Sequence, residues 1–571
     1  MKQKIKTLLS HYQPMQIFQQ QNKKGLVTIN ARFRQQVRLW GLMSLLLTIF
    51  ISDLLATKYS LVGRVGVFAW YASFFCLIVI ALKNIWILIL TSLKNKSFFT
   101  LAGLLILISL IVINLTKPQN ISGETTQEVN CALSYFQTKD WGYHDSCFLG
   151  YPVRQYLIPA LPSLIWGRNQ LTLNLGGSLY FLTAVIIFSQ SLLEYFRFSQ
   201  KNDLITAIIL TSLLHFHYLN HFLFHLFEQS NFPLSLSLLT IGLLFKFLKQ
   251  KKPRWLVLIG ISFQYLVFSY TPSLAFLGLG LVGLGYLLTK HQNKLNKFIS
   301  LSIIVITLMS LCLSLSFRRD IRLLGNDNNT PITFIQNLNQ IGQHLLFSNQ
   351  GQSFYSPIIV FPLLITVLIP LTLVLGWQAA CIAGWVCLTV IVATQAKGYS
   401  FYSLDFRIHR ALVVAPTVLT LLHLLLQKIN LQKKLSRSFL IVTLLLLTLS
   451  GLKYQTDYIK NRPISQHLAF SLWLKQQLPD FQTQQKLYFI NPKTKFISLR
   501  DELQYFFPQL ILTNKTIAPS QTNCTSSQPG LYLVHSSHVC YDILSQPDEK
   551  KEVIAYYTDF QGQQLLLLQQ N

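Results

Sequence analysis

Long apolar segments alternate with short polar ones over most of this chain. An apolar stretch of about 20 residues is long enough to cross a bilayer as a helix. By that criterion the pattern predicts a polytopic α-helical membrane protein with about thirteen transmembrane helices. The expected spans are 39–57, 65–82, 99–116, 172–192, 203–222, 232–247, 255–271, 273–289, 298–317, 357–375, 378–394, 411–427 and 438–454. The apolar segment 85–93 is too short to span alone, so it either lies at the membrane interface or extends the preceding helix.

Composition narrows the class further. Of the 571 residues, 51% are apolar and only 12% are charged, which excludes a disordered chain. The net charge of +28 could indicate nucleic-acid binding in a soluble protein. Here the apolar residues are laid out in long runs, so we expect membrane lipids as partners and no nucleic acid.

The positive charge is unevenly distributed between alternate connections. Residues 1–38 carry eight Lys and Arg and no acid, and they predict a basic cytoplasmic arm. If that end is cytoplasmic, the connections on the same side, the arm included, total 25 basic and two acidic residues. This asymmetry is what the positive-inside rule predicts. We therefore expect a multi-pass protein of the cell (plasma) membrane with a cytoplasmic N-terminus and an extracytoplasmic C-terminal domain.

The predicted organisation has three parts: the arm 1–38, a transmembrane domain 39–454, and an extracytoplasmic domain 455–571. The transmembrane domain has its polar mass in outer loops at 117–171, 318–356 and 395–410. In the C-terminal part, a helical pattern is interspersed with short buried strands, which is typical of a small α/β unit. The helix is expected at 464–478, and the strands at 486–492, 530–538, 552–560 and 563–570.

Four cysteines fall on the predicted outer face as two local pairs. Cys131 and Cys147 share the first outer loop, and Cys524 and Cys540 share the C-terminal domain. Local pairs on an oxidising face predict two disulfides. The alternative is two pairs of free thiols.

The first outer loop carries the acidic residues that could perform chemistry. Glu124 and Glu128 are one helical turn apart, so on a helix their carboxylates share a face, and Asp140 comes after them. A carboxylate next to the membrane, in a site that excludes water, has a raised pKa and can act as a general base. The alternative is a set of solvated carboxylates balanced by the loop's own Lys and Arg residues.

Two groups of cations lie on the same predicted face, against the positive-inside bias. Arg318 and Arg319 come directly after one span, and Arg407, His409 and Arg410 precede another, with Lys397 in the same loop. Cations at lipid-headgroup depth could neutralise a departing phosphate, and Arg can do so with two hydrogen bonds. They could equally anchor headgroups or pair with nearby aspartates.

A stripe of histidines begins at the outer end of the span 203–222 and continues beyond it. His217, His221 and His225 are four residues apart, and Glu228 comes three later, so on a helix they share one face. Such spacing can bind a divalent metal. Contact with a donor phosphate or an acceptor, and plain hydrogen bonding between helices, remain open.

The order of motifs in the first outer loop resembles that of GT-C glycosyltransferases, closest to the family of protein O-mannosyltransferases and bacterial lipid A aminoarabinose transferases. Glu124 matches the first acid of that family's Asp-Glu pair, with Thr125 in place of the second. Lys139-Asp140-Trp141 matches a Gly-Asp-Trp, and 156–169 matches an amphipathic segment that ends in Phe-Gly-x-Asn. Asn174 stands where an Arg is common. Segments 334–364 and 406–422 resemble later parts of bacterial members.

The resemblance implies an enzyme that moves a sugar, with inversion, from a polyprenyl-phosphate-linked donor to a lipid, glycan or protein acceptor on the outer face. Glu124 would be the base, and the outer cations would hold the phosphate. Glu228 lies roughly where a second acid is often found. Some superfamily members use a metal and others none, so a divalent metal stays an open possibility. The alternatives are a lipid or polysaccharide transporter or flippase, a polysaccharide ligase or polymerase, and a non-catalytic scaffold.

Overall fold

The computed structural model describes the chain in parts. These are 33–94 and 101–115 with short gaps, 123–137, 152–196, and 232–317 with short gaps. In the C-terminal region they are 466–477, 486–490, 505–507, 511–515, 529–536, 540–546, 551–558 and 564–570.

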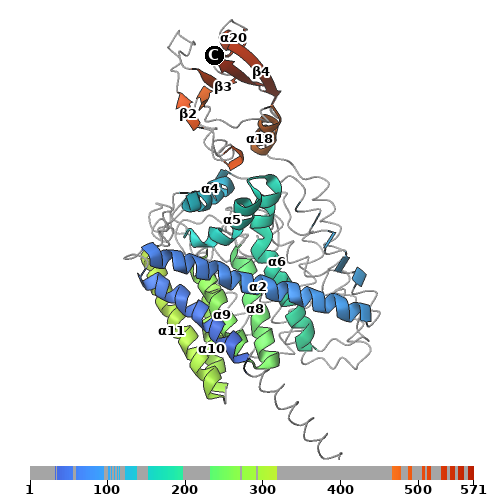
Figure 1. Ribbon diagram of the computed structural model, residues 1–571, viewed down its shortest axis with the longest axis vertical. Coiled ribbons are helices and arrows are strands. Elements are labelled where there is room, and N and C mark those ends of the chain that lie inside the picture. Colours follow the sequence, from blue (N-terminus) through green and yellow to red (C-terminus); the bar gives the residue numbers. More distant parts are fainter. Residues whose placement is uncertain are drawn as a thin grey trace, which may run out of the picture.

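A body of long apolar helices makes up most of the described chain (Figure 1). After a helix at Gln35–Leu55 come α2 (Ser60–Lys94), α4 (Gly123–Gln137), α5 (Arg154–Trp166), α6 (Gln170–Phe196), α8 (Phe232–Gln250), α9 (Pro253–Val267), α10 (Ser273–Lys290) and α11 (Lys294–Phe317). Within the described residues, four helices are long and apolar enough to cross a membrane: Gln35–Leu55, Leu61–Lys94, Gln170–Phe188 and Lys294–Ser316. The predicted class of a polytopic helical membrane protein is therefore confirmed.

The helices match the hydropathy pattern closely wherever they are described. The expected spans at 39–57, 65–82, 172–192, 232–247, 255–271, 273–289 and 298–317 each coincide with a helix. The segment 85–93 extends the preceding helix, because α2 continues to Lys94. The spans at 203–222, 357–375, 378–394, 411–427 and 438–454 lie outside the described residues, and 99–116 is described only in part. The total of about thirteen stays a prediction.

The body is packed around α6, which contacts α8, α5 and α2. A β-carbon on Gly242 of α8 would lie 2.8 Å from the Cα of Phe188 on α6, so the two backbones meet at a distance that only glycine permits. On the other side of α8, α9 packs against α8 and α11. The short helices α4 and α5 lie across the end of α6 that is nearest the C-terminal unit (Figure 1).

The C-terminal unit is a mixed five-stranded sheet in the order β2-β1-β3-β5-β4. Its strands are β1 (Lys486–Ile490), β2 (Ile511–Lys515), β3 (Gly530–His535), β4 (Lys551–Thr558) and β5 (Gln564–Gln570), with helices α18 (Gln466–Gln477) and α20 (Tyr541–Leu544). β1 runs parallel to β2 and β3, and β5 runs antiparallel to β3 and β4. The helix predicted at 464–478 and all four predicted strands are confirmed, whereas β2 was not predicted. The boundary at 455 stays a prediction.

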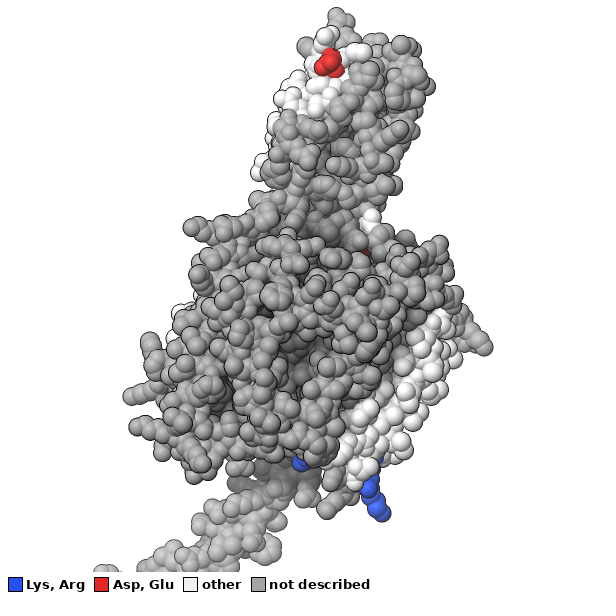
Figure 2. Space-filling model, turned by 180° about the vertical axis from the view of Figure 1, so that it is seen from behind, with Lys and Arg blue, Asp and Glu red and all other residues white. Residues whose placement is uncertain are grey.

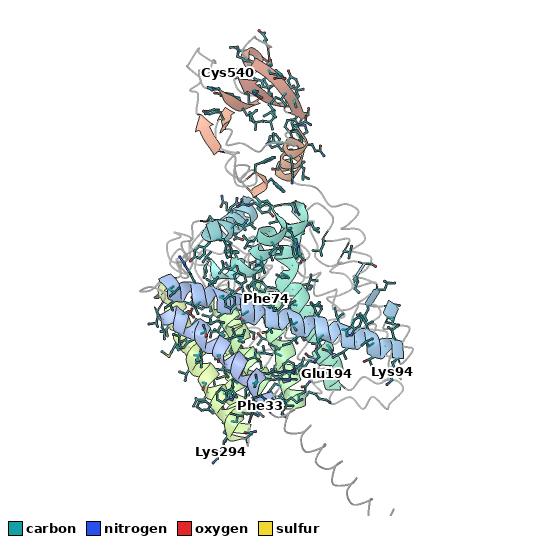
Figure 3. The ribbon with its side chains drawn as sticks, in the orientation of Figure 1. Phe33, Phe74, Lys94, Glu194, Lys294 and Cys540 are labelled. Carbon is teal, nitrogen blue, oxygen red and sulfur yellow. The ribbon has the colours of Figure 1, made fainter. Side chains whose placement is uncertain are left out.

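The face in Figure 2 shows a few charged side chains among the described residues. On the face in Figure 2, the visible Lys and Arg side chains lie at the end away from the sheet, and acidic side chains appear at the sheet. Glu194 and Lys294 mark that distant end, and Cys540 marks the sheet (Figure 3). The orientation of the termini in a membrane stays a prediction.

Cys131 on α4 and Cys540 beside α20 are each disulfide-bonded. The expected partners Cys147 and Cys524 lie outside the described residues, so the two pairings remain predictions.

Candidate functional site

The residues predicted to carry chemistry in the first outer loop map to two short helices, α4 and α5. α4 contains both Glu124 and Glu128, which confirms that the two residues share one helix. α5 contains Pro159 and Pro162, yet it remains a continuous helix with most of its side chains buried. The two helices pack against each other, and α5 packs against α6. Together they form a cover over one end of the helical body, which we call the α4–α5 cover.

Glu128 joins the two helices of the cover. Its side chain is fully buried, and Oε1 accepts a hydrogen bond of 2.8 Å from the hydroxyl of Tyr156 on α5. Val129 and Ala132 are buried on the same helix. A carboxylate withdrawn from water is stable only where donors replace the lost hydration, and Tyr156 supplies one. In this arrangement Glu128 sets the position of α4 relative to α5.

A second buried charge ties the cover to the membrane helices. The guanidinium of Arg154, at the start of α5, forms an ion pair of 2.5 Å with Asp53, near the end of the helix Gln35–Leu55. The side chains of both residues are at most 1% exposed. The Arg154 guanidinium also lies 3.6 Å from the ring centroid of Phe268, just after α9, and 5.7 Å from that of Trp70 on α2. Four separate elements therefore meet at one arginine.

An aromatic cluster supports α5 from below. The rings of Trp70 and Tyr265 have centroids 4.2 Å apart, and the Tyr265 hydroxyl donates to the Trp70 carbonyl at 2.8 Å. Tyr180 on α6 stacks edge-on against Phe74 and Phe232, at 5.1 and 5.2 Å. Paired aromatic rings of this kind contribute about 0.5–1.5 kcal/mol each beyond their buried area. The cluster packs α2, α6 and α9 together next to α5, which it contacts through the Tyr180 hydroxyl.

The turn from α5 to α6 is fixed by its own sequence, Trp-Gly-Arg-Asn. Gly167 ends α5 with φ of 82°, a conformation that favours glycine. Asn169 then caps α6: its Oδ1 accepts from the Thr172 backbone N–H at 2.9 Å, and the Thr172 hydroxyl accepts from the Asn169 N–H at 3.1 Å. This reciprocal arrangement is a capping box. The segment that resembles the family motif Phe-Gly-x-Asn thus has a structural role in this chain.

The C-terminal unit docks on that same turn. The hydroxyl of Tyr505 donates to the Asn169 carbonyl at 3.1 Å and lies 2.8 Å from the Ser163 hydroxyl on α5. Burial raises the pKa of Tyr505, and it lowers the pKa of the adjacent Arg168. Because a buried phenol is favoured in its neutral form, the contact depends on Tyr505 staying protonated.

The other predicted site residues are placed only in part. Glu124 lies in the first turn of α4, but its side chain is outside the described part of the structure. The residues outside the described chain are Asp140, Arg318, Arg319, Lys397, Arg407, His409, Arg410, Glu228, His217, His221 and His225. Convergence of Glu124 with the outer cations therefore stays a prediction. No cluster of three metal-ligating side chains occurs within the described part of the chain, and the His stripe lies outside it.

Sequence reasoning missed the Asp53–Arg154 pair and the docking role of Tyr505. A signal for the first was present, because Asp53 is the one acidic residue well inside a predicted span, and such a residue requires a partner. The side-chain amide of Asn174 donates to the Leu115 carbonyl at 2.9 Å. It therefore links α6 to the preceding apolar segment.

Comparisons with known proteins give one structural similarity of note. No family model matches the chain, and no curated protein matches it in sequence. Among solved structures, the chain is similar to the apo crystal structure of ArnT from Cupriavidus metallidurans. The two share 11% sequence identity with a TM-score of 0.48, over 83% of this chain and 98% of that one.

Proposed function

We propose that this chain is an integral-membrane glycosyltransferase that moves a sugar from a polyprenyl-phosphate-linked donor to an acceptor beside the α4–α5 cover. The proposal rests on the ordered motifs of the first outer loop and on the position of the helix that carries its two glutamates. One observation carries it: α4 is joined to α5 by the hydrogen bond between Glu128 and Tyr156, α5 packs on α6, and Glu124 lies one turn before Glu128 on α4.

The two glutamates then have different roles. Glu128 is fully buried and engaged by Tyr156, so it is suited to positioning. Glu124 is the residue we assign as general base. The acceptor O–H or N–H gives its proton to the Glu124 carboxylate while the acceptor atom attacks the anomeric carbon. The bond from that carbon to the phosphate oxygen breaks, and polyprenyl phosphate leaves with the electron pair. Because the acceptor attacks from the face opposite the leaving phosphate, the configuration at the anomeric carbon is inverted.

The departing phosphate needs positive charge. We assign this role to Arg407 and Arg410, with His409, Lys397, Arg318 and Arg319 as further candidates. Arginine can hold a phosphate through two parallel hydrogen bonds, and such groups contribute most where charge develops in the transition state. The acceptor is a lipid, a glycan or a protein. A divalent metal at the His stripe remains a separate hypothesis.

The test is sugar transfer by the full chain reconstituted in liposomes with a panel of polyprenyl-phosphate-linked sugars. Glu124→Gln should lower turnover about 100-fold or more, since general-base catalysis contributes about 10²–10⁴. The matched control is Glu552→Gln on the exposed part of β4, which should leave turnover unchanged. Wild-type turnover by Glu124→Gln would show that the assignment of the base is wrong.

The cations have a test of their own. Arg407→Ala and Arg410→Ala should raise the donor concentration needed for half-maximal turnover more than the acceptor concentration. Equal loss for both substrates would contradict a role in holding the donor phosphate.

A further inference from the structure

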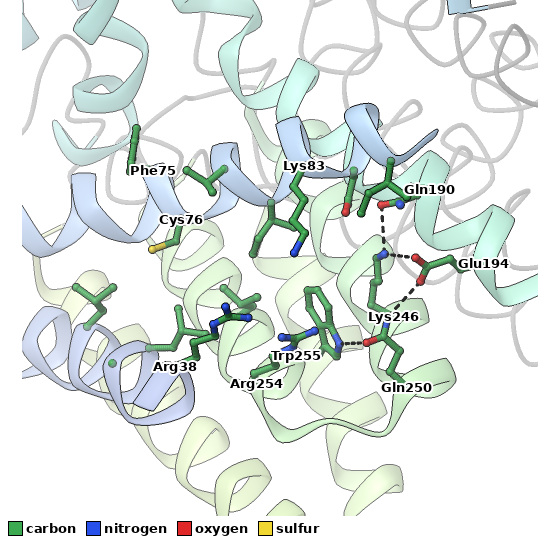
Figure 4. A pocket seen from close by; sticks show the side chains of 18 residues that line it. Arg38, Phe75, Cys76, Lys83, Gln190, Glu194, Lys246, Gln250, Arg254 and Trp255 are labelled. Atoms are coloured by element: carbon green, nitrogen blue, oxygen red, sulfur yellow. Dashed lines mark hydrogen bonds and ion pairs between the residues drawn. The ribbon is translucent and has the colours of Figure 1, made fainter. Parts of the chain in front are cut away.

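A cavity of about 720 Å³ lies at the end of the helical body opposite the α4–α5 cover. It is bordered by the helix Gln35–Leu55 and by α2, α6, α8 and α9 (Figure 4). It is separate from the site proposed above, because it lies where α6 and α8 end and α9 begins, whereas α4 and α5 lie at the start of α6.

Four cations and one carboxylate face this cavity: Arg38, Lys83, Lys246, Arg254 and Glu194. Glu194 is already engaged, because Lys246 Nζ lies 2.7 Å from its Oε1 and the Gln250 amide donates to its Oε2 at 3.2 Å. The Lys246–Glu194 pair is therefore neutral as a unit.

Three cations remain at the cavity without an acidic partner among the described residues: Arg38, Lys83 and Arg254. Arg38 and Arg254 are close enough for their positive charges to repel each other, and Figure 4 shows their guanidinium groups side by side. Gathering like charges costs free energy unless an anion lies between them. The arm 1–38 cannot supply one, because it has no acidic residue.

Unsatisfied donors also face the cavity. Asn84 is 6% exposed, and its side-chain amide nitrogen has no hydrogen-bond partner in the described structure. The Nε of Arg254 is likewise buried without a partner there. Buried donors are nearly always satisfied in native proteins, so two at one cavity are consistent with an acceptor supplied by a ligand, since no described residue supplies one.

Apart from Gln190 and Gln250, which bond to Lys246 and Glu194, the rest of the lining is mainly apolar. The apolar part consists of Gly41, Leu42, Leu45, Phe75, Cys76, Val79, Ile80, Ile87, Trp255 and Leu258, and the cations lie at one side of it (Figure 4). On α2, Phe75 is 64% exposed and Val79 46% exposed, so the apolar wall continues onto the outer surface of the helix. A ligand that fits is anionic at one end and hydrocarbon at the other.

We propose that this cavity binds an anionic phospholipid, with its phosphate among Arg38, Lys83 and Arg254 and an acyl chain along the apolar wall of α2. The headgroup oxygens accept from the Asn84 amide and from Arg254. Basic pockets between membrane helices recognise such headgroups by this combination of charge and hydrogen bonding. The site does not depend on the proposed sugar transfer.

The experiment measures lipid binding to the purified full chain in neutral detergent by native mass spectrometry, with phosphatidylglycerol as the probe and phosphatidylcholine as the neutral comparison. The variant is Arg38→Gln/Arg254→Gln. The control is Lys249→Gln/Lys252→Gln, which removes the same charge from the same end but from residues that do not line the cavity. We expect affinity for phosphatidylglycerol to fall about tenfold or more in the first variant, and less than twofold in the control.

A second variant separates shape from charge. Gly41 lines the cavity, and a β-carbon there would have no atom within 4 Å, so Gly41→Phe fills the space and keeps every cation. It should reduce phosphatidylglycerol binding as well. Thermal unfolding without added lipid checks that each variant is folded, and the increase in Tm caused by phosphatidylglycerol should be lost only in the cavity variants.

Three outcomes would overturn the proposal. Equal loss in the cavity and control variants would indicate general surface attraction. Full competition by inorganic phosphate at the same concentration would show that no acyl chain is recognised. Preference for polyprenyl phosphate over phosphatidylglycerol by tenfold or more would assign the cavity to a carrier lipid instead.

Discussion

Breaking the Asp53–Arg154 pair should destabilise the protein more than any other single change of charge in its described part. Arg154→Met leaves the Asp53 carboxylate with an exposure of 0% and without its cation. Removing one partner of a buried ion pair typically costs about 3–5 kcal/mol. The contact of the guanidinium with the Phe268 ring, at 3.6 Å, adds about 1–2 kcal/mol to the loss.

The same reasoning gives the opposite expectation for the double variant. Asp53→Leu/Arg154→Met removes both charges and fills the space with apolar atoms. Replacing a buried pair in this way is often neutral, because the desolvation of two charges is avoided. We therefore expect the double variant to be more stable than Arg154→Met alone, with a coupling energy of about 2–3 kcal/mol.

The assay is thermal unfolding in detergent, combined with the fraction of protein that stays monodisperse on size exclusion. Asp53→Asn is the matching change on the acidic side of the pair. Glu194→Gln is its control, since both substitutions convert a paired carboxylate to its amide. The Glu194 side chain is 35% exposed, although that of Lys246 is only 3% exposed, so water reaches the pair from one side and the loss of the Glu194 charge should cost less than the loss of the Asp53 charge. Equal shifts in Tm for Asp53→Asn and Glu194→Gln, or additive effects in the double variant, would refute the reasoning.

Three further outcomes are expected from the packing of the described residues. Tyr505→Phe removes the hydroxyl that contacts Ser163 and Asn169, so it should weaken docking of the C-terminal unit by about 1–2 kcal/mol, seen as faster hydrogen exchange in the α5–α6 turn. Tyr556→Phe on β4, 51% exposed, should change nothing. Burial raises the pKa of Tyr505 above its ordinary value of 10, so the docking that its hydroxyl supports is complete below pH 10 and is lost as the pH rises further. The Tyr505→Phe variant should lack this alkaline transition in its hydrogen-exchange rates. Gly242→Ala forces a β-carbon to within 2.8 Å of the α6 backbone and should lower Tm by several degrees. Gly278→Ala in α10, with open space around it, should be neutral or slightly stabilising. A lower Tm for Gly278→Ala than for Gly242→Ala would contradict this account of the α6–α8 contact.

The elements of this fold were predictable where a local pattern determines them. Apolar length predicted the helices, and alternation of strands with turns predicted β1, β3, β4 and β5. β2 was not predicted from the sequence, because Ile511–Lys515 has only two large apolar residues before a polar run. Its place at the sheet edge depends on pairing with β1, which no local pattern encodes.

The candidate site was predictable only in its residue types. Glu128 was selected for its charge and spacing, but its partner Tyr156 comes from a different helix. Asp53 is conspicuous in an apolar span, yet nothing nearby in the sequence indicates that Arg154 is the cation that reaches it. Such partners are chosen by the packing of α5 across the bundle, a property of the tertiary structure alone.

The two ends of the helical body use charge in different ways. At the α4–α5 cover, Arg154 is met by Asp53 and Glu128 by Tyr156, so the charges there are engaged by the chain itself and hold the helices still. At the opposite cavity, three cations and two buried donors face an open, largely apolar space. Paired charges stabilise the packing of the helices, whereas cations without an acidic partner among the described residues are available to an anionic ligand. The reaction centre proposed beside the cover also needs positive charge, which we assign to the cations of the late outer loops, so a measured distance between those cations and Glu124 tests the proposed transfer.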